Sequence, residues 1–122
     1  MAGISSIESL FLSGSTNGRG IKVTGTSAAT ADTLHTATNT ANTVDQVWLF
    51  AANQSSANLT LTLCLGGTTD PDDLVSLSLP PTSGDIPILQ GERFAGGVVL
   101  KAYATTANYI VIRGIVDRIT NG

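Results

Sequence analysis

The clearest pattern along the chain is the strict alternation of apolar and polar residues that is typical of a half-buried β-strand. From residue 59 to 65 every odd position is leucine, while the even positions are Thr, Thr and Cys. Residues 74–79 alternate in a similar way and end at Pro80 and Pro81, which cannot continue a ladder. The Gly- and Asp-rich turn at 66–73 therefore predicts a hairpin with a long loop.

Further strand signals flank this predicted hairpin. Residues 44–52 are apolar at both odd and even positions, which predicts a strand covered on both sides, either central in a sheet or at a subunit contact. Residues 97–104 and 109–119 are rich in Val, Ile and Tyr, and the short polar link between them predicts a second hairpin. Gly114 has the parity of the apolar residues around it, so we expect a bulge or a close backbone approach there. Weaker strand candidates are 21–26 and 86–89.

Seven or eight short strands without a helical crossover predict an all-β fold, an antiparallel β-sandwich or jelly roll. We expect this sandwich domain to span residues 44–122. Residues 1–43 differ, because Gly14–Gly20 and the Thr/Ala-rich segment 27–43 have too little apolar surface for a core of their own. They are expected to form an extended N-terminal arm that lies on the sandwich or reaches a neighbouring subunit, anchored by the apolar residues Ile4, Ile7, Leu10, Phe11 and Leu12.

Composition excludes several classes of protein. The 122 residues suit one small domain, and six Lys and Arg against nine Asp and Glu leave no cationic stripe for nucleic acid. No apolar run is long enough to span a membrane, and the first residues lack the basic and apolar regions of a secretory signal, so synthesis in a cytoplasm without membrane association is expected. The single Cys excludes an intrachain disulfide and a Cys-based zinc site.

Few residues suggest catalysis or metal binding. His35 is the only histidine, it lies in an alternating polar segment where exposure is expected, and no G-x-S-x-G motif accompanies it. Asp70, Asp72 and Asp73 could offer oxygen ligands to calcium, but their spacing lacks the Gly and distal Glu of an EF-hand, so a solvated turn is the preferred interpretation. We therefore expect no enzyme activity, no metal and no cofactor.

Three other features have weaker functional interpretations. Cys64 shares the Thr face of its strand, which would leave its thiol accessible, but no neighbouring cation activates it and a space-filling role is preferred. Gly14–Gly20 lacks the Lys-Ser/Thr of a phosphate-binding loop and is interpreted as a flexible arm or loop. Trp48, Tyr103 and Tyr109 suit either a carbohydrate platform or a subunit interface, and the interface is preferred.

Four segments together resemble small virion proteins of tailed bacteriophages, most closely head decoration (cement) proteins. They are the apolar run 47–53, the leucine strand with its turn through Asp73, residues 88–91, and the closing run 112–119. The resemblance covers about residues 44–120 and is one of pattern, without a diagnostic motif. It implies a non-enzymatic capsid protein on the virion surface, typically a homotrimer bound to the major capsid protein.

Two alternatives remain open: a tail or head-tail joining subunit, and a receptor-binding fibre-tip module. A joining or tail subunit would form rings of higher order, and a fibre tip would show exposed aromatic residues converging on a glycan. The apolar residues on 44–52 and the small size of the domain favour a cyclic homo-oligomer, a trimer in the first instance. The interface candidates are Ile4, Ile7, Leu10, Phe11, Trp48, Phe50, Tyr103 and Tyr109.

Overall fold

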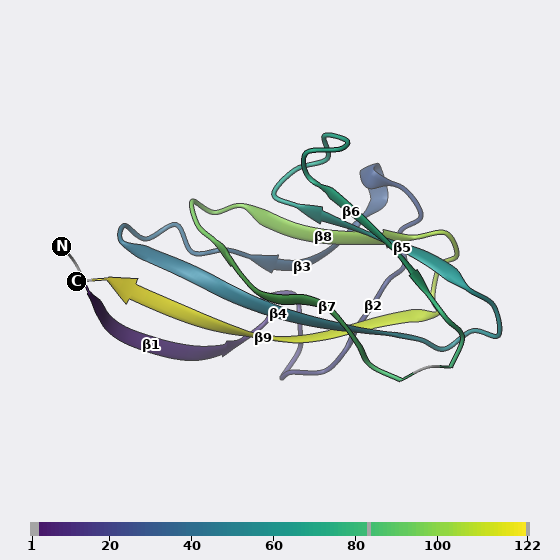
Figure 1. Ribbon diagram of the computed structural model, residues 1–122, viewed down its shortest axis with the longest axis horizontal. Coiled ribbons are helices and arrows are strands. Elements are labelled where there is room, and N and C mark those ends of the chain that lie inside the picture. Colours follow the sequence, from purple (N-terminus) through teal and green to yellow (C-terminus); the bar gives the residue numbers. More distant parts are fainter. Residues whose placement is uncertain (1–2, 83, 122) are drawn as a thin grey trace.

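The computed structural model describes residues 3–82 and 84–121, which form two antiparallel sheets packed face to face (Figure 1). The first sheet has the order β1 (Ile4–Phe11), β9 (Ile110–Asn121), β4 (Thr43–Asn53), β7 (Ile86–Phe94), and β2 (Ile21–Lys22) also pairs with β9. The second has the order β3 (Asp32–Thr36), β8 (Val99–Ala104), β5 (Leu59–Leu65), β6 (Leu74–Leu79). A 3-10 helix, η1 (Ala28–Thr30), precedes β3. The predicted all-β sandwich is therefore confirmed.

The apolar positions of the alternating strands form the core between the sheets. Leu61 and Leu63 of β5 are buried in the same cluster as Val47 and Leu49 of β4. Burial of such side chains is the main favourable contribution to folding, and it requires that each strand present its apolar face to the other sheet. The alternation seen in the sequence thus fixes which face of each strand is internal.

Two of the predicted pairings have the expected form. β5 and β6 are antiparallel neighbours, with Leu61 opposite Leu77, as the predicted hairpin requires. β4 lies between β9 and β7 and is therefore a central strand. Its inner residues are buried, whereas Trp48 and Phe50 on its outer side are only half-buried.

The second predicted hairpin is wrong. β8 pairs with β3 and β5 in one sheet, whereas β9 pairs with β1 and β4 in the other. The connection at 105–109 crosses from sheet to sheet, and the amide of Asn108, whose φ is 76°, donates to the carbonyl of Val23 at 2.9 Å. Four or five extended residues can cross a core that is about 10 Å thick. A short link therefore does not distinguish a hairpin from a crossing between sheets.

Residues 3–43 are built into the sandwich itself, more fully than an arm that only lies on it. β1 and β2 pair with β9 in one sheet, β3 pairs with β8 in the other, and Leu12, Val23 and Leu34 are part of the common core. This part of the chain has no core of its own, as expected, but its few apolar residues fill the core that residues 44–121 provide. Its polar residues form loop contacts; for example, Asp32 accepts hydrogen bonds from the amides of Thr24 and Gly25.

Gly114 marks a close approach of two backbones, one of the two predicted possibilities. A side chain there would overlap the backbone carbonyl oxygen of Trp48, and it would lie about 3.1 Å from the Leu12 side chain. The register between β4 and β9 is continuous through this position, so there is no bulge between them. Only glycine leaves room here for the loop after β1 to pack against the sheet.

Candidate interaction surface

The outer face of the first sheet has a row of large apolar side chains across three neighbouring strands. Phe11 of β1 lies opposite Ile115 of β9, which in turn lies opposite Trp48 of β4. Residues that pair across antiparallel strands point to the same face, so the three side chains are neighbours. A second apolar row, Ile7, Ile119 and Val44, lies four residues along β1, and a polar row separates the two.

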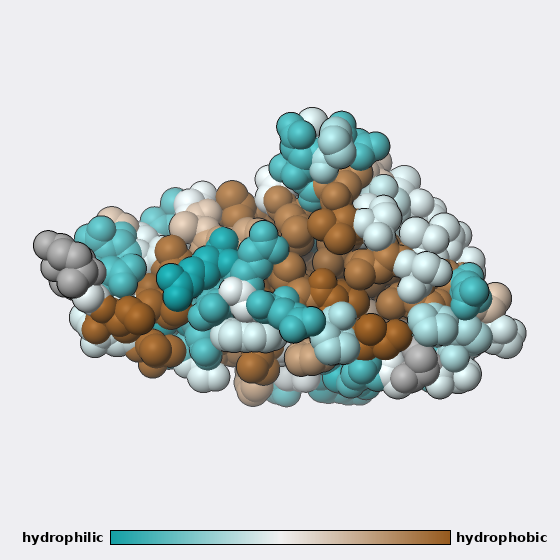
Figure 2. Space-filling model, in the orientation of Figure 1, coloured by the Kyte–Doolittle hydropathy of each residue, from teal (hydrophilic) through white to brown (hydrophobic). Residues whose placement is uncertain are grey.

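Much of this outer face is open to solvent. Ile7, Phe11 and Ile115 are 60%, 62% and 50% exposed. Trp48 is half-buried, and its ring lies beside Gly91, where a Cβ atom would be about 3.2 Å from the indole. Figure 2 shows apolar side chains gathered over β1 at one end of the molecule. Neighbouring exposed apolar residues of this size are typical of protein contact sites. We call Ile7, Phe11, Trp48, Phe50 and Ile115 the apolar outer face.

The apolar outer face continues to β1, which is the edge strand of its sheet. From Ser6 to Phe11 its register with β9 is regular, it contains no Pro or Lys, and its only charged residue is Glu8. The opposite edge, β7, contains Pro87 and two irregularities in its register with β4. Proline, lysine and bulges are the devices that protect edge strands from pairing with another chain. β1 is thus the less protected edge of this sheet.

The structure brings together four of the eight interface candidates and separates the others. Ile7, Phe11, Trp48 and Phe50 share the apolar outer face, and Ile4 begins the same edge strand. Leu10 points inward opposite Val116 and packs against the core. The two tyrosines lie elsewhere, Tyr103 opposite Thr62 on the second sheet and Tyr109 in the loop before β9.

Sequence reasoning did not include Ile115 among the interface candidates, although it is central to this face. The signal was present, because Ile115 has the same parity as the charged residues Arg113 and Asp117, and charged residues in a half-buried strand mark the side opposite the core. An isoleucine in that series implies an apolar residue turned outward.

His35 is buried, contrary to the expected exposure. Its Nδ1 accepts a hydrogen bond from the Ser13 amide at 3.0 Å, and its Nε2 lies 2.8 Å from Oδ2 of Asp45. Because Nδ1 is an acceptor, Nε2 carries the proton and donates to the carboxylate. Both ring nitrogens are therefore engaged, and the imidazole is not free to act as a base.

Asp45 is the centre of this buried polar bridge, which consists of His35, Asp45 and Arg118. The carboxylate is fully buried and accepts two hydrogen bonds from the Arg118 guanidinium, at 2.8 and 3.0 Å, and one from the Thr38 amide. Burial raises the pKa of Asp45, but the hydrogen bonds from Arg118, His35 and Thr38 outweigh it and hold the pKa below its ordinary value. The hydrogen bond to Asp45 likewise raises the pKa of Arg118. The bridge is a structural ion pair between the two sheets.

The remaining chemical candidates offer no reactive arrangement. Cys64 is buried, in agreement with the preferred space-filling role, and burial raises its pKa and so disfavours the thiolate. Asp70 and Asp72 are exposed in the loop between β5 and β6, and Asp73 accepts a hydrogen bond from the Thr69 amide at 3.1 Å. Within residues 3–82 and 84–121, no three His, Cys, Asp or Glu side chains form a group that could hold a metal. The same residues include no helix long and apolar enough to cross a membrane.

Comparison of the chain with models of protein families, with curated proteins and with solved structures finds no match. The interpretation of its function therefore depends on the surface and the interior described above.

Proposed function

We propose that this protein is a non-enzymatic structural protein of a tailed-bacteriophage virion, a head decoration protein that forms a homotrimer and binds the capsid across subunit boundaries. The observation that carries the proposal is the apolar outer face and its continuation into β1, the less protected edge strand of the sheet. A surface of this kind serves contact with another protein. It has none of the titratable groups that a catalytic site needs.

The first partner in this proposal is a second copy of the chain. An edge strand with a regular register can extend its sheet by pairing with a strand of a neighbour, and the exposed side chains of Phe11 and Ile115 then become buried at the contact. In a cyclic trimer the contacts are head to tail, so the β1 edge of each copy meets a different surface of the next copy, and three such contacts close the ring.

The strand order also supports the proposal. Without the two-residue β2, eight strands remain, and the first sheet has the order first, eighth, third, sixth, while the second has the order second, seventh, fourth, fifth. We assign this order to a double-sheet jelly roll, an architecture used by viral capsid proteins and by lectins. Because one fold serves many functions, this support is one of analogy.

The buried histidine and cysteine also support a non-enzymatic function. The one histidine has both ring nitrogens hydrogen-bonded in a buried bridge, and the one cysteine is a buried thiol. The side chains that most often act as bases and nucleophiles are thus used in packing. A protein that acts by contact requires only a rigid frame for its surface, which the bridge and the core provide.

Oligomeric state is the first test. We expect the full chain to be a trimer by sedimentation velocity at micromolar concentration. Ile115→Asp places an unpaired charge in the contact and should raise the dissociation constant at least thirtyfold, which corresponds to about 2 kcal/mol. Thr60→Asp is the matched control, because Thr60 is an exposed residue on the outer face of the second sheet. A monomeric full chain, or equal effects of the two variants, would contradict the proposal.

Capsid binding is the second test. The full chain is added to empty capsids of the parent phage, and occupancy is measured by cosedimentation at 0.1 and 1 M NaCl. Few exposed charges and an apolar contact predict similar occupancy at both salt concentrations. Bound protein should also raise the temperature at which capsids disrupt, because it stabilises the shell by RT ln(1 + [L]/Kd) per site. Rings of six or more copies without capsid binding would favour the tail or head-tail joining alternative instead.

A further inference from the structure

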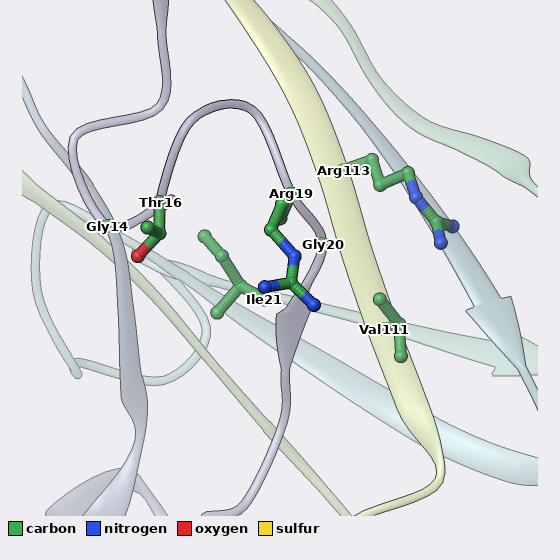
Figure 3. Close-up of a pocket in the computed structure, with 7 residues that line it drawn as sticks. All are labelled: Gly14, Thr16, Arg19, Gly20, Ile21, Val111 and Arg113. Carbon is green, nitrogen blue, oxygen red and sulfur yellow. The ribbon is translucent and has the colours of Figure 1, made fainter.

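A cleft of about 560 Å³ lies between the loop at 13–20 and strand β9 (Figure 3). It borders the apolar outer face, because Arg113 of its lining lies opposite Phe50. Its apolar part is formed by Ile21 of β2 and Val111 of β9, and its polar part by Thr16, Arg19 and Arg113. In Figure 3 the guanidinium of Arg19 lies near the side chains of Ile21 and Val111. The volume is within the usual range for small-molecule sites, about 300–1,000 Å³.

Positive charge is concentrated at this cleft. The chain has a net charge of −3 and only six Lys and Arg residues, yet Arg19, Lys22 and Arg113 all lie on the loop at 13–20, on β2 or on the adjoining half of β9. Arg19 has no ion-pair partner in the part of the chain that the structure describes. Arg113 has an exposed one, Asp85, at 3.1 Å. An exposed pair of this kind is weak and can exchange its carboxylate for another anion.

The loop that carries Arg19 is held in place by its own hydrogen bonds. Ser15 Oγ donates to the Arg19 carbonyl at 2.6 Å, and the Arg19 amide donates to the Thr16 carbonyl at 3.0 Å. The Gly14 amide donates to the Leu34 carbonyl at 2.9 Å and thereby connects the loop to β3. A ligand therefore meets a backbone that is already ordered, which lowers the entropy lost on binding.

Gly20 keeps the cleft open. A Cβ atom at this position would overlap the Val111 side chain and lie about 3.6 Å from the guanidinium carbon of Arg113. Glycine thus lets the loop approach β9 while the Arg113 side chain stays close to the rim. The shape of the cleft thus depends on Gly20 in the loop and on Val111 and Arg113 in β9.

We propose that this cleft binds a small organic oxyanion, with its phosphate or carboxylate group held by Arg19 and Arg113 and its carbon skeleton packed on Ile21 and Val111. The planar guanidinium donates two parallel hydrogen bonds to either type of oxyanion, which makes arginine well suited to such groups. Two arginines line the cleft, and Lys22 lies on the adjoining strand, so the positive charge suits a ligand of one or two charges and is too small for a nucleic acid backbone. The proposal does not depend on the proposed virion function.

The test is a ¹⁵N NMR titration of the full chain at low salt with four compounds: inorganic phosphate, ribose 5-phosphate, glucuronate and neutral ribose. We expect saturable shifts of the Thr16, Arg19 and Gly20 amides with at least one sugar anion, at a lower Kd than with inorganic phosphate, and none with ribose. The two sugar anions distinguish a phosphate ligand from a carboxylate ligand. No saturable shift with any anion, or equal binding of ribose, would overturn the proposal.

Variants assign the binding to the cleft. Arg19→Ala should raise Kd at least tenfold, whereas Arg93→Ala, an exposed arginine on β7, should leave it unchanged. Asp85→Asn removes the carboxylate that competes for Arg113 and should lower Kd severalfold. The spectrum of each free variant reports its fold, and Arg19→Lys, which keeps the charge without the planar group, supplies a second variant at the same position. An unchanged Kd in a folded Arg19→Ala protein would overturn the assignment.

Discussion

The space between the two sheets is filled in two different ways along its length. Around the middle of the sandwich, Leu49, Leu61 and Leu63 belong to a continuous apolar cluster. Toward the end of the sandwich where β1 begins and β9 ends, the polar bridge of His35, Asp45 and Arg118 occupies the interior instead. In the apolar cluster, a substitution that changes the shape of a side chain lowers stability in proportion to the size of the change. In the bridge, each polar group needs its partners in fixed positions.

The difference shows what each region contributes. A buried ion pair loses the hydration of both partners, so it adds less net stability than apolar residues of equal volume, but it requires one arrangement of its groups. The three members come from β3, β4 and β9, which belong to both sheets. We infer that the bridge fixes how the sheets are placed at this end, while the leucines supply most of the free energy of folding.

The largest expected effect is that of Asp45→Ala. The substitution leaves the Arg118 guanidinium and His35 without their shared acceptor, and removal of one partner from a buried pair costs about 3–5 kcal/mol. The measurement is the free energy of unfolding in urea. Asp117→Ala is the control, because it removes a carboxylate from the outer face of β9 and should change stability by less than about 0.5 kcal/mol. Equal effects of the two variants would contradict the role of the bridge.

Leu63→Ala tests the apolar region. Leu63 is fully buried in β5, and truncation of such a side chain costs about 2–5 kcal/mol through lost burial and the cavity left behind. Its neighbour Val75 on β6 is 40% exposed, so Val75→Ala should cost less than about 1 kcal/mol. The same urea experiment measures both. A loss for Val75→Ala that matched the loss for Leu63→Ala would show that the core extends to the edge of the sheet.

His35→Ala should have an intermediate effect, about 1–3 kcal/mol, because it leaves the buried Asp45 oxygen and the Ser13 amide without a partner. If His35 were exposed, as the sequence alone predicts, the same substitution would be nearly neutral. Urea unfolding measures the loss, and His35→Gln, which can restore one of the two hydrogen bonds, should recover part of it. A neutral result for His35→Ala would mean that the bridge does not need its histidine.

The smallest expected effect is a loss of stability in acid. Burial alone would raise the pKa of Asp45, but the hydrogen bonds from Arg118, His35 and the Thr38 amide lower it by a larger amount. The pKa in the folded protein therefore lies below the ordinary 3.8. The folded protein thus keeps this carboxylate ionised at a pH where the unfolded chain is protonated. Its contribution is complete above the unfolded pKa and is lost as the pH falls from about 4 toward the folded pKa.

The measurement is urea unfolding at several pH values between 6 and 2.5, compared with Asp45→Asn. Below pH 4 the free energy of unfolding should fall less steeply for Asp45→Asn than for the unsubstituted protein. Some decrease should remain in the variant, because Asp32, whose pKa is also lowered, retains its own contribution. Parallel curves for the two proteins would show that Asp45 does not account for the acid sensitivity.

The sequence was most informative where the signal is local. Residues 59–65 and 74–79 match β5 and β6 because alternation directly reports which side of a strand is buried. The partner of a strand is a different question: nothing within 97–104 or 109–119 indicates that the two enter different sheets. The pairing depends on the path of the whole chain, which short windows do not contain.

The polar bridge and the role of the first 43 residues could not be predicted for a related reason. His35 and Asp45 are 10 residues apart, while Asp45 and Arg118 are 73 apart, so no spacing connects the three. The first 43 residues look too polar to fold because each of their strands needs only one or two core residues when the rest of the core is supplied elsewhere. Ile115, in contrast, could have been identified from its parity alone.

The pairing of the first and last strands determines how the molecule would respond to a pulling force. Ile4 lies opposite Asn121 and Phe11 opposite Ile115, so the outer ends of β1 and β9 are adjacent. A force applied between the two ends of the chain therefore separates this ladder one hydrogen bond at a time, as a zipper opens, and does not load all the bonds at once. Tension across the two ends would detach the edge strand β1 first. The protein would then lose two side chains of the apolar outer face, Ile7 and Phe11.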